Sequence, residues 1–204
     1  IDDYDKTNIG SPMPKFTFGW TNTFHYKNFD LSVFINGSYG NKVFNYLGMK
    51  LTHMNSAWTN QLNTVSDRAI LAPVDPDKVY PDGANWYDDV TNVRVVNRGT
   101  SIPRASIQDP NDNDRISDRY IEDGSYIRLK NIAWGYTFPA ETITNWGLQN
   151  LRVYANIQNL WTITRYSGYD PEIGASTASQ NVFGLDNGRY PSPTAFSLGL
   201  NISF

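Results

Sequence analysis

The last eleven residues of the chain, 194–204, alternate strictly between two kinds of side chain. A two-residue period is that of a β-strand, in which successive side chains point to opposite faces. A strand of this length can cross a tilted path through a bilayer, whereas strands of soluble proteins have about 5–6 residues. The segment therefore predicts a long strand with one wholly apolar face, formed by Phe196, Leu198, Leu200, Ile202 and Phe204.

The same alternation recurs upstream, and in all it predicts five strands, at about 15–26, 29–40, 125–138, 150–163 and 194–204. The first two are separated by the two-residue turn Lys27-Asn28, which predicts a hairpin. The parity of the apolar residues changes near Lys130-Asn131 and again near Asn159-Leu160. A β-bulge or a change of face is expected at these two places.

Composition agrees with strands that face lipid. Aromatic residues make up 14% of the chain, yet its mean hydropathy is only −0.49, because apolar residues are dispersed rather than gathered in runs. Dispersed apolar residues are typical of membrane β-barrels. Short and long connections alternate, which predicts outer loops at 41–124 and 164–193 and places Phe204 at the periplasmic rim. Within the first loop, helical spacing from Asn41 to Trp58 predicts a short amphipathic helix.

Several functions lack support in the sequence. The net charge is −3, so no basic surface favours nucleic acid, and the absence of cysteine removes thiolate chemistry. The two histidines, His25 and His53, have no further zinc ligands close by in the sequence and no nucleophile-elbow context. We therefore expect neither an enzyme nor a cofactor.

Four stretches resemble the closing segment of the SusC/RagA-like TonB-dependent transporters. They are IGSPMPKFTFGWTNTFHYKNFDLSVFINGSYGN, DRYIEDGSYIRLKNIAWGYTFP, LRVYANIQNLWTITRYSGYDPEIG and LDNGRYPSPTAFSLGLNISF. The resemblance implies an all-β fold, a transmembrane antiparallel β-barrel of about 22 strands, of which residues 1–204 supply the last five or so. It implies that the plug domain, and the N-terminal part that engages TonB, lie outside this chain.

The resemblance also implies a function. Such transporters import oligosaccharides or oligopeptides across the outer membrane of Gram-negative bacteria of the Bacteroidetes type, with a SusD-like surface lipoprotein as lid. A terminal strand that ends on an aromatic residue resembles the signal read by the barrel-assembly machinery, which would comprise the five apolar residues of 196–204. The alternative is a soluble, secreted β-sandwich that binds glycan through surface aromatics, and it would bury its apolar row.

Candidate contact residues follow from these expectations. Polar strand residues predict the lining of the lumen, where they would face the pore, the plug or a substrate: Asn36, Arg152, Tyr154, Asn156, Gln158 and Asn201. Flat rings beside acceptors predict a substrate contact at Trp86, Tyr87 and Asp88. Tyr166, Tyr169 and Asp170 match a family motif that either binds substrate or holds its own loop.

A weak calcium candidate lies in the first outer loop. Asp109, Asn111 and Asn113 have the spacing of the first three ligands of a calcium loop. Asp114 stands where that loop requires glycine, and Tyr120 where it requires glutamate. A solvated polar turn is the competing interpretation, so we expect no metal.

Overall fold

The computed structural model describes residues 3–56, 58–109, 112–173 and 182–204. The chain divides into two compact units, which are described separately. The strand unit consists of Asn8–Tyr46 and Asp118–Phe204. The loop unit consists of Leu47–Ser117 with the N-terminal residues up to Thr7. No helix among the described residues is long and apolar enough to span a bilayer.

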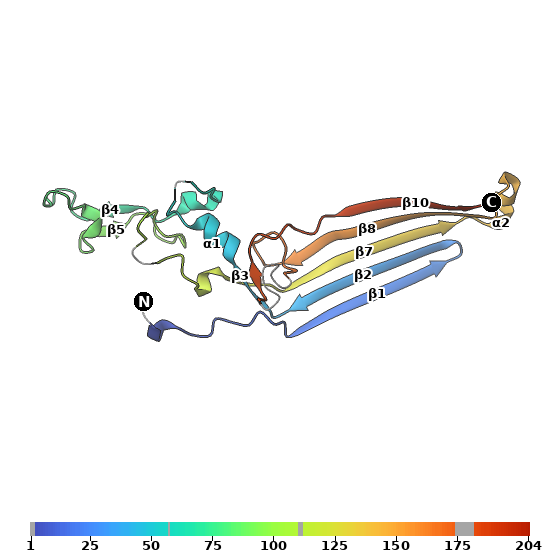
Figure 1. Ribbon diagram of the computed structural model, residues 1–204, viewed down its shortest axis with the longest axis horizontal. Coiled ribbons are helices and arrows are strands. Elements are labelled where there is room, and N and C mark those ends of the chain that lie inside the picture. Colours follow the sequence, from blue (N-terminus) through green and yellow to red (C-terminus); the bar gives the residue numbers. More distant parts are fainter. Residues whose placement is uncertain (1–2, 57, 110–111, 174–181) are drawn as a thin grey trace. The chain divides into compact units, whose positions relative to one another are not determined.

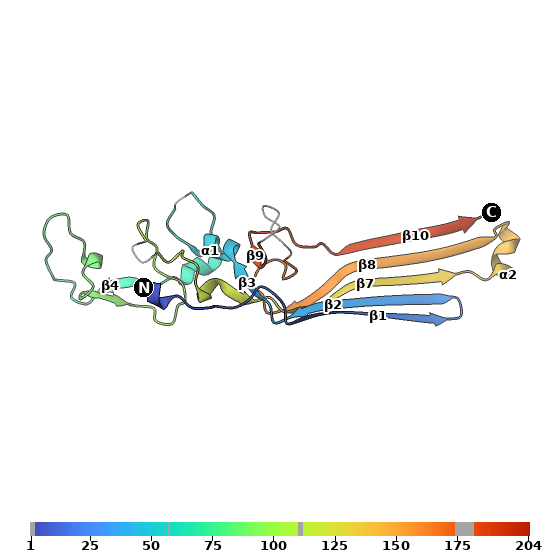
Figure 2. The same ribbon diagram turned by 60° about the horizontal axis from the view of Figure 1, so that its bottom comes forward.

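Five long antiparallel strands form the main sheet of the strand unit, in the order β1-β2-β7-β8-β10. Their bounds are Phe16–Tyr26 (β1), Phe29–Tyr39 (β2), Tyr126–Thr137 (β7), Asn150–Thr164 (β8) and Ala195–Ser203 (β10). Figures 1 and 2 both show the five strands side by side in one layer. The expectation of an all-β, antiparallel fold with about five long strands is confirmed.

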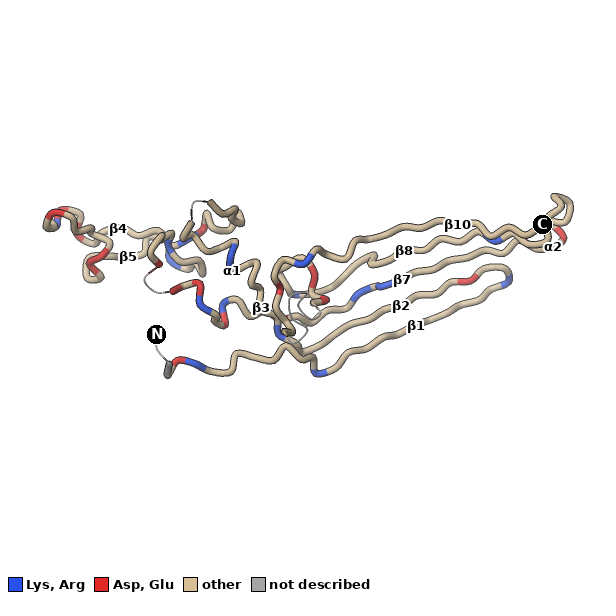
Figure 3. The backbone as a smooth tube through the Cα atoms, in the orientation of Figure 1, with Lys and Arg blue, Asp and Glu red and all other residues tan. Residues whose placement is uncertain are grey.

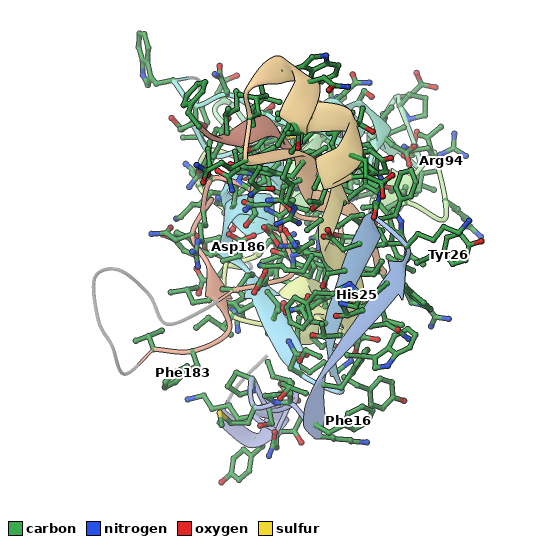
Figure 4. All side chains as sticks on the ribbon, turned by 90° about the vertical axis from the view of Figure 1, so that its right-hand side faces the viewer. Phe16, His25, Tyr26, Arg94, Phe183 and Asp186 are labelled. Atoms are coloured by element: carbon green, nitrogen blue, oxygen red, sulfur yellow. The ribbon has the colours of Figure 1, made fainter. Side chains whose placement is uncertain are left out.

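Pairing between the strands separates the side chains into two faces, because directly opposed residues share a face. One cross-strand row consists of Asn22, Val33, Ile132, Ile157 and Phe196, and it is apolar except for Asn22. The neighbouring row consists of Ser32, Ala133, Asn156 and Ser197. The first row belongs to what we call the apolar face, and the second to the polar face. On β1 the consecutive residues His25 and Tyr26 lie on opposite sides of the strand (Figure 4).

Charged side chains are scarce along these strands (Figure 3). β1 and β10 contain none, and the other three strands contain only Asp30, Arg128, Lys130 and Arg152. Asp30, Arg128 and Arg152 lie on the polar face by their pairing. In the described strands, none of the charged residues that pair across the sheet lies on the apolar face.

A bulge explains the change of parity in β7. Phe34 pairs with Asn131 and Ile35 with Leu129, so Lys130 has no partner on β2. On the other side, the register between β7 and β8 also shifts between Leu129 and Asn131. The extra residue returns Leu129 to the apolar face, beside Ile35. Of the two expected alternatives, the bulge is confirmed.

Short connections join the strands at one end of the sheet. The β1–β2 turn has Lys27 in the left-handed region, at a φ of 52°. The β7–β8 connection contains a single helical turn, α2 (Ala140–Ile143), followed by η5 (Thr144–Trp146) and a left-handed Gly147. The C-terminus lies at this same end (Figure 1). The long connections thus lie at the opposite end.

A second, small sheet covers that opposite end of the strand unit. β3 (Lys42–Asn45) pairs antiparallel with β6 (Ile121–Asp123) and parallel with β9 (Leu185–Asp186), and η4 (Asp118–Tyr120) precedes β6. Val43 of β3 is 1% exposed and forms part of its core. The small sheet brings both long connections together at the ends of β2 and β8.

Besides most of α1, the described residues of the loop unit form short elements: η1 (Asp3–Asp5), η2 (Asn63–Asp67), η3 (Trp86–Asp88) and the antiparallel pair β4 (Leu71–Pro73) and β5 (Val93–Val95). The expected helix from Asn41 to Trp58 is shorter than predicted. α1 covers Tyr46–Thr52, because the residues before it pair with β6 and β9 instead of coiling. Met49 is the buried residue of α1.

Candidate functional site

The residues expected to line the lumen all lie on the polar face. Arg152 lies opposite Asn201, and Asn156 opposite Ser197. Gly135 of β7 leaves room for an ion pair that crosses it, in which Arg152 Nη2 is 2.7 Å from Asp30 Oδ2. A Cβ on Gly135 would overlap that guanidinium. The members brought onto one face are Asn36, Arg152, Tyr154, Asn156, Gln158 and Asn201.

A buried ion-pair network fixes the segment after β8 to the sheet. Arg128 is 4% exposed, and its guanidinium donates to Asp170 Oδ1 at 2.5 Å and to Glu172 Oε2 at 2.7 Å. Its Nε donates to Thr162 Oγ1. Burial alone would raise the pKa of Asp170, but hydrogen bonds from Arg128 and from the backbone N–H groups of Ser192 and Glu172 lower it to about 2.

A second buried contact holds the same connection to the small sheet. The hydroxyl of Tyr166, a residue 5% exposed, donates to Asp186 Oδ2 at 2.5 Å. Burial and this carboxylate raise the pKa of Tyr166 far above its ordinary value. Asp186 itself is 2% exposed and also accepts from the backbone N–H of Gly188. Tyr166 and Asp170 thus have their polar atoms engaged inside the loop, whereas Tyr169 is 65% exposed.

Trp86, Tyr87 and Asp88 lie together on η3 in the loop unit. The two rings are perpendicular, with centroids 5.7 Å apart and an interplanar angle of 79°. All three residues line an open cavity of about 870 Å³, and Arg68 and Arg104 line it too. Trp86, Tyr87 and Asp88 could be grouped from the sequence because they are adjacent. The sequence carried no signal for the arginines, which reach the cavity from distant segments.

A polar clamp supports the loop that carries η3. Asn92 is 3% exposed, and its amide donates to the Asp75 carbonyl and the Tyr80 hydroxyl while accepting from the Asp75 N–H. Asp89 accepts from Lys78, Tyr80 and Thr91. Hydrogen bonds, first from Lys78 and then from Thr91, hold the pKa of Asp89 well below its ordinary value. These residues hold the loop rather than face the cavity.

The calcium candidate has a different arrangement from a calcium loop. Asp109 accepts from both the backbone N–H and the side-chain amide of Asn113, so Asn113 acts as a donor rather than a ligand oxygen. Burial would raise the pKa of Asp109, but the bonds from Asn113 and His53 lower it. Asn111 lies outside the described residues.

His53 has carboxylates nearby that the sequence did not reveal. Its Nε2 lies 3.0 Å from Asp109 Oδ2, and its Nδ1 lies 3.9 Å from Asp114 Oδ2. The three residues offer ligand atoms within 4.8 Å of one another. Each ring nitrogen faces a different carboxylate, however, and the two nitrogens of an imidazole point in different directions. His53 thus has a hydrogen bond to Asp109 and only a longer contact with Asp114, and the two carboxylates do not face one ring nitrogen.

Comparison with known proteins gives the family. No protein-family model matches the chain. The TonB-dependent receptor P3 of Formosa agariphila is 34% identical over the whole chain, which covers 18% of that receptor. The TonB-dependent receptor SusC of Bacteroides thetaiotaomicron is 30% identical, again over the whole chain and 16% of its own length.

Solved structures share the fold. The RagAB peptide importer in its closed-closed state matches with a TM-score of 0.66 at 20% identity, over 96% of this chain and 18% of the importer chain. The open-open state matches with a TM-score of 0.65. These relatives are receptors and an importer rather than enzymes, in agreement with the expectation from the sequence. The chain spans less than a fifth of the length of the relatives it matches, and it belongs to the SusC/RagA-like TonB-dependent receptors as a segment of their β-barrel.

Proposed function

We propose that the protein takes part in the import of oligosaccharides or oligopeptides across the outer membrane of a Gram-negative bacterium of the Bacteroidetes type. In this proposal energy comes from TonB, through the part of the receptor outside this chain, and a SusD-like lipoprotein closes over the outer loops. The observation that carries the proposal is the five-stranded sheet with an uncharged apolar face, in a chain of this receptor family.

The apolar face suits lipid. In the described residues no second sheet covers it, and Phe196 and Leu198 are 72% and 79% exposed. Each large apolar side chain moved from water to an apolar surrounding gains about 1.5–3 kcal/mol, so such a row needs a covering medium. A soluble β-sandwich would supply a second sheet. A bilayer supplies acyl chains, which fits the exposed rows better.

The sheet also needs further strands. Within the described residues β1 and β10 each pair on one side only. Unpaired backbone groups cost several kcal/mol each in lipid, so membrane strands close into barrels. We therefore assign residues 1–204 to the C-terminal part of the receptor's barrel, with outer loops at 41–124 and 164–193. The remaining strands and the plug belong to the rest of the receptor.

The polar face suits a hydrated lumen with a plug. Buried atoms without a hydrogen-bond partner among the described residues include Asn36 Oδ1, Asn156 Oδ1 and Arg152 Nε. Buried polar groups are normally satisfied, so a further partner is expected there. The side chains around these atoms would have to move before an amide or hydroxyl group of the plug or of a passing substrate could meet this need.

The outer loops supply the substrate contacts in this proposal. Trp86, Tyr87 and Asp88 line the loop-unit cavity, and Tyr169 is exposed after β8. Aromatic rings serve both sugars and peptides. We keep oligopeptides as an alternative substrate because a solved structure that shares the fold is the RagAB peptide importer. We also assign the barrel-assembly signal to β10 and the residue after it, through Phe196, Leu198, Leu200, Ile202 and Phe204.

The experiment is a deletion of the full-length receptor gene in its native host, complemented by the wild-type gene. Growth and uptake are measured on a panel of neutral and acidic oligosaccharides and oligopeptides, with and without functional TonB. The proposal predicts that one class of oligomer fails to enter the deletion strain and the strain without TonB, while monomers still support growth. Unchanged uptake of every oligomer, or a receptor recovered in the soluble fraction, would contradict it.

A further inference from the structure

The cavity of the loop unit is large enough for a ligand. Its volume of about 870 Å³ lies within the range of about 300–1,000 Å³ that is usual for small-molecule sites. It is built from three separate stretches, 68–71, 85–88 and 104–108, together with Met54. All of them belong to the loop unit. The site is therefore a property of one compact unit.

Two arginines give the cavity a positive character. Arg68 and Arg104 both line it, against a single lining carboxylate, Asp88. Among the described residues neither guanidinium has a hydrogen bond or an ion pair, although both residues are partly buried. Arg128 and Arg152 of the strand unit, in contrast, are paired with carboxylates. A partly buried, unpaired guanidinium favours an anion that it can bind through parallel hydrogen bonds.

Backbone contacts fix the two arginine-bearing segments beside each other. The Ala69 N–H donates to the Ile102 carbonyl at 2.9 Å, and the Asn97 amide donates to the Arg68 carbonyl at 2.7 Å. Asn97 also accepts from the Ile70 N–H at 2.7 Å. The positions of both arginines are thus set before a ligand arrives, which lowers the entropy lost on binding.

Beside its aliphatic residues, the cavity has aromatic and neutral polar side chains that suit a saccharide. Trp86 and Tyr87 present perpendicular rings, and a flat ring can stack on the apolar face of a pyranose. Asn85, Ser106 and Gln108 add neutral donors and acceptors suited to hydroxyl groups. Ring surfaces, neutral polar groups and two guanidiniums together match a sugar that bears an anionic group.

We propose that this cavity binds a carboxylate- or sulfate-bearing unit of an oligosaccharide, with Arg68 and Arg104 on the anionic group and Trp86 against the sugar ring. This inference rests on the proposed import function and narrows its substrate class. It makes the outer loop a site that selects charged over neutral glycans. Binding should weaken as salt is added, because screening lowers the attraction of partly exposed charges.

The test uses the full-length receptor purified in detergent, with isothermal titration calorimetry. The probes are a galacturonic-acid tetramer, its neutral methyl-esterified form, a sulfated galactose tetramer and a tetraglutamate peptide. The variants are R68Q and R104Q, and the matched control is R94Q. Arg94, labelled in Figure 4, is an exposed arginine of β5 outside the cavity, so its variant loses the same charge.

The proposal predicts that R68Q and R104Q each weaken binding of an acidic saccharide at least tenfold. R94Q should change the affinity for that saccharide less than twofold. R68Q and R104Q should change the affinity for the neutral form less than twofold. The two acidic saccharides distinguish a carboxylate from a sulfate. Tetraglutamate binding that depends on the same arginines, or no arginine-dependent binding of any probe, would overturn it. If the binding results overturn this inference but the wild-type receptor still imports a neutral oligomer in cells, the proposed function stands. If it imports nothing, the proposed function fails as well.

Discussion

Replacement of Arg128 by methionine should release the segment after β8 from the sheet. Arg128 donates to Asp170, Glu172 and Thr162 from a position 4% exposed. Methionine keeps the apolar stem but removes all of these donors. Among the described residues, the buried Asp170 carboxylate would keep the backbone N–H groups of Ser192 and Glu172 as partners.

The expected cost is large for one substitution. Removal of one partner from a buried ion pair costs about 3–5 kcal/mol, because the other charge is left uncompensated. The same contacts lower the pKa of Asp170 to about 2 in the folded protein from an ordinary 3.8. By proton linkage this shift corresponds to about 2–2.5 kcal/mol. Because the folded pKa is lowered, that stabilisation is present above pH 4 and is lost as the pH falls towards 2.

Hydrogen exchange with mass spectrometry on the full-length receptor measures the effect. Peptides that cover 165–173 and 182–192 should exchange roughly 10²-fold faster in R128M than in the wild type at pH 7, from a loss of about 3 kcal/mol. The matched control is K130M. Lys130 contacts the same Glu172 but is 31% exposed, so its loss should cost under about 1 kcal/mol. Equal exchange in R128M and K130M would refute the reasoning.

Three further predictions concern single residues. Tyr166→Phe leaves Asp186 short of one buried donor and should destabilise the loop by about 1.5–3 kcal/mol in thermal unfolding of the receptor, whereas Tyr169→Phe, at an exposed ring, should have no effect. Gly135→Ala should cost under about 1 kcal/mol in thermal unfolding, because the new Cβ displaces only the flexible ends of the part-exposed Arg152 and Asp30 side chains, and a much larger loss would contradict this reasoning. Phe204→Asp should reduce the amount of receptor in the outer membrane, measured by quantitative immunoblotting, and wild-type amounts would rule out the assembly role.

The strands could be predicted from the sequence because their signal is local. In β10 every second residue is apolar, and no tertiary contact is needed to read the pattern. The bulge at Lys130 was also visible, since it shifts the parity of the residues around it. The α1 helix was overestimated, because the pairing of β3 with two strands far along the chain competes with helix formation.

Contacts between distant segments had no local signal. Arg128 and Asp170 are 42 residues apart, and the two arginines of the cavity lie on segments that hydrogen bonds such as Ala69 N–H to the Ile102 carbonyl hold together. The grouping of Trp86 with Tyr87 was predictable because the residues are adjacent. The cavity beside them was not, because its walls come from three stretches of the chain.

The central claim is that the apolar face meets lipid and the polar face meets the aqueous lumen. Nitroxide spin labels placed singly at 196–203 of the full-length receptor in lipid bilayers test it, by electron paramagnetic resonance with oxygen and a water-soluble nickel chelate as relaxants. The account predicts a two-residue alternation, with oxygen contact highest at Phe196, Leu198, Leu200 and Ile202 and nickel contact higher at Ser197, Asn201 and Ser203. Uniform accessibility along β10, or the opposite phase, would contradict it.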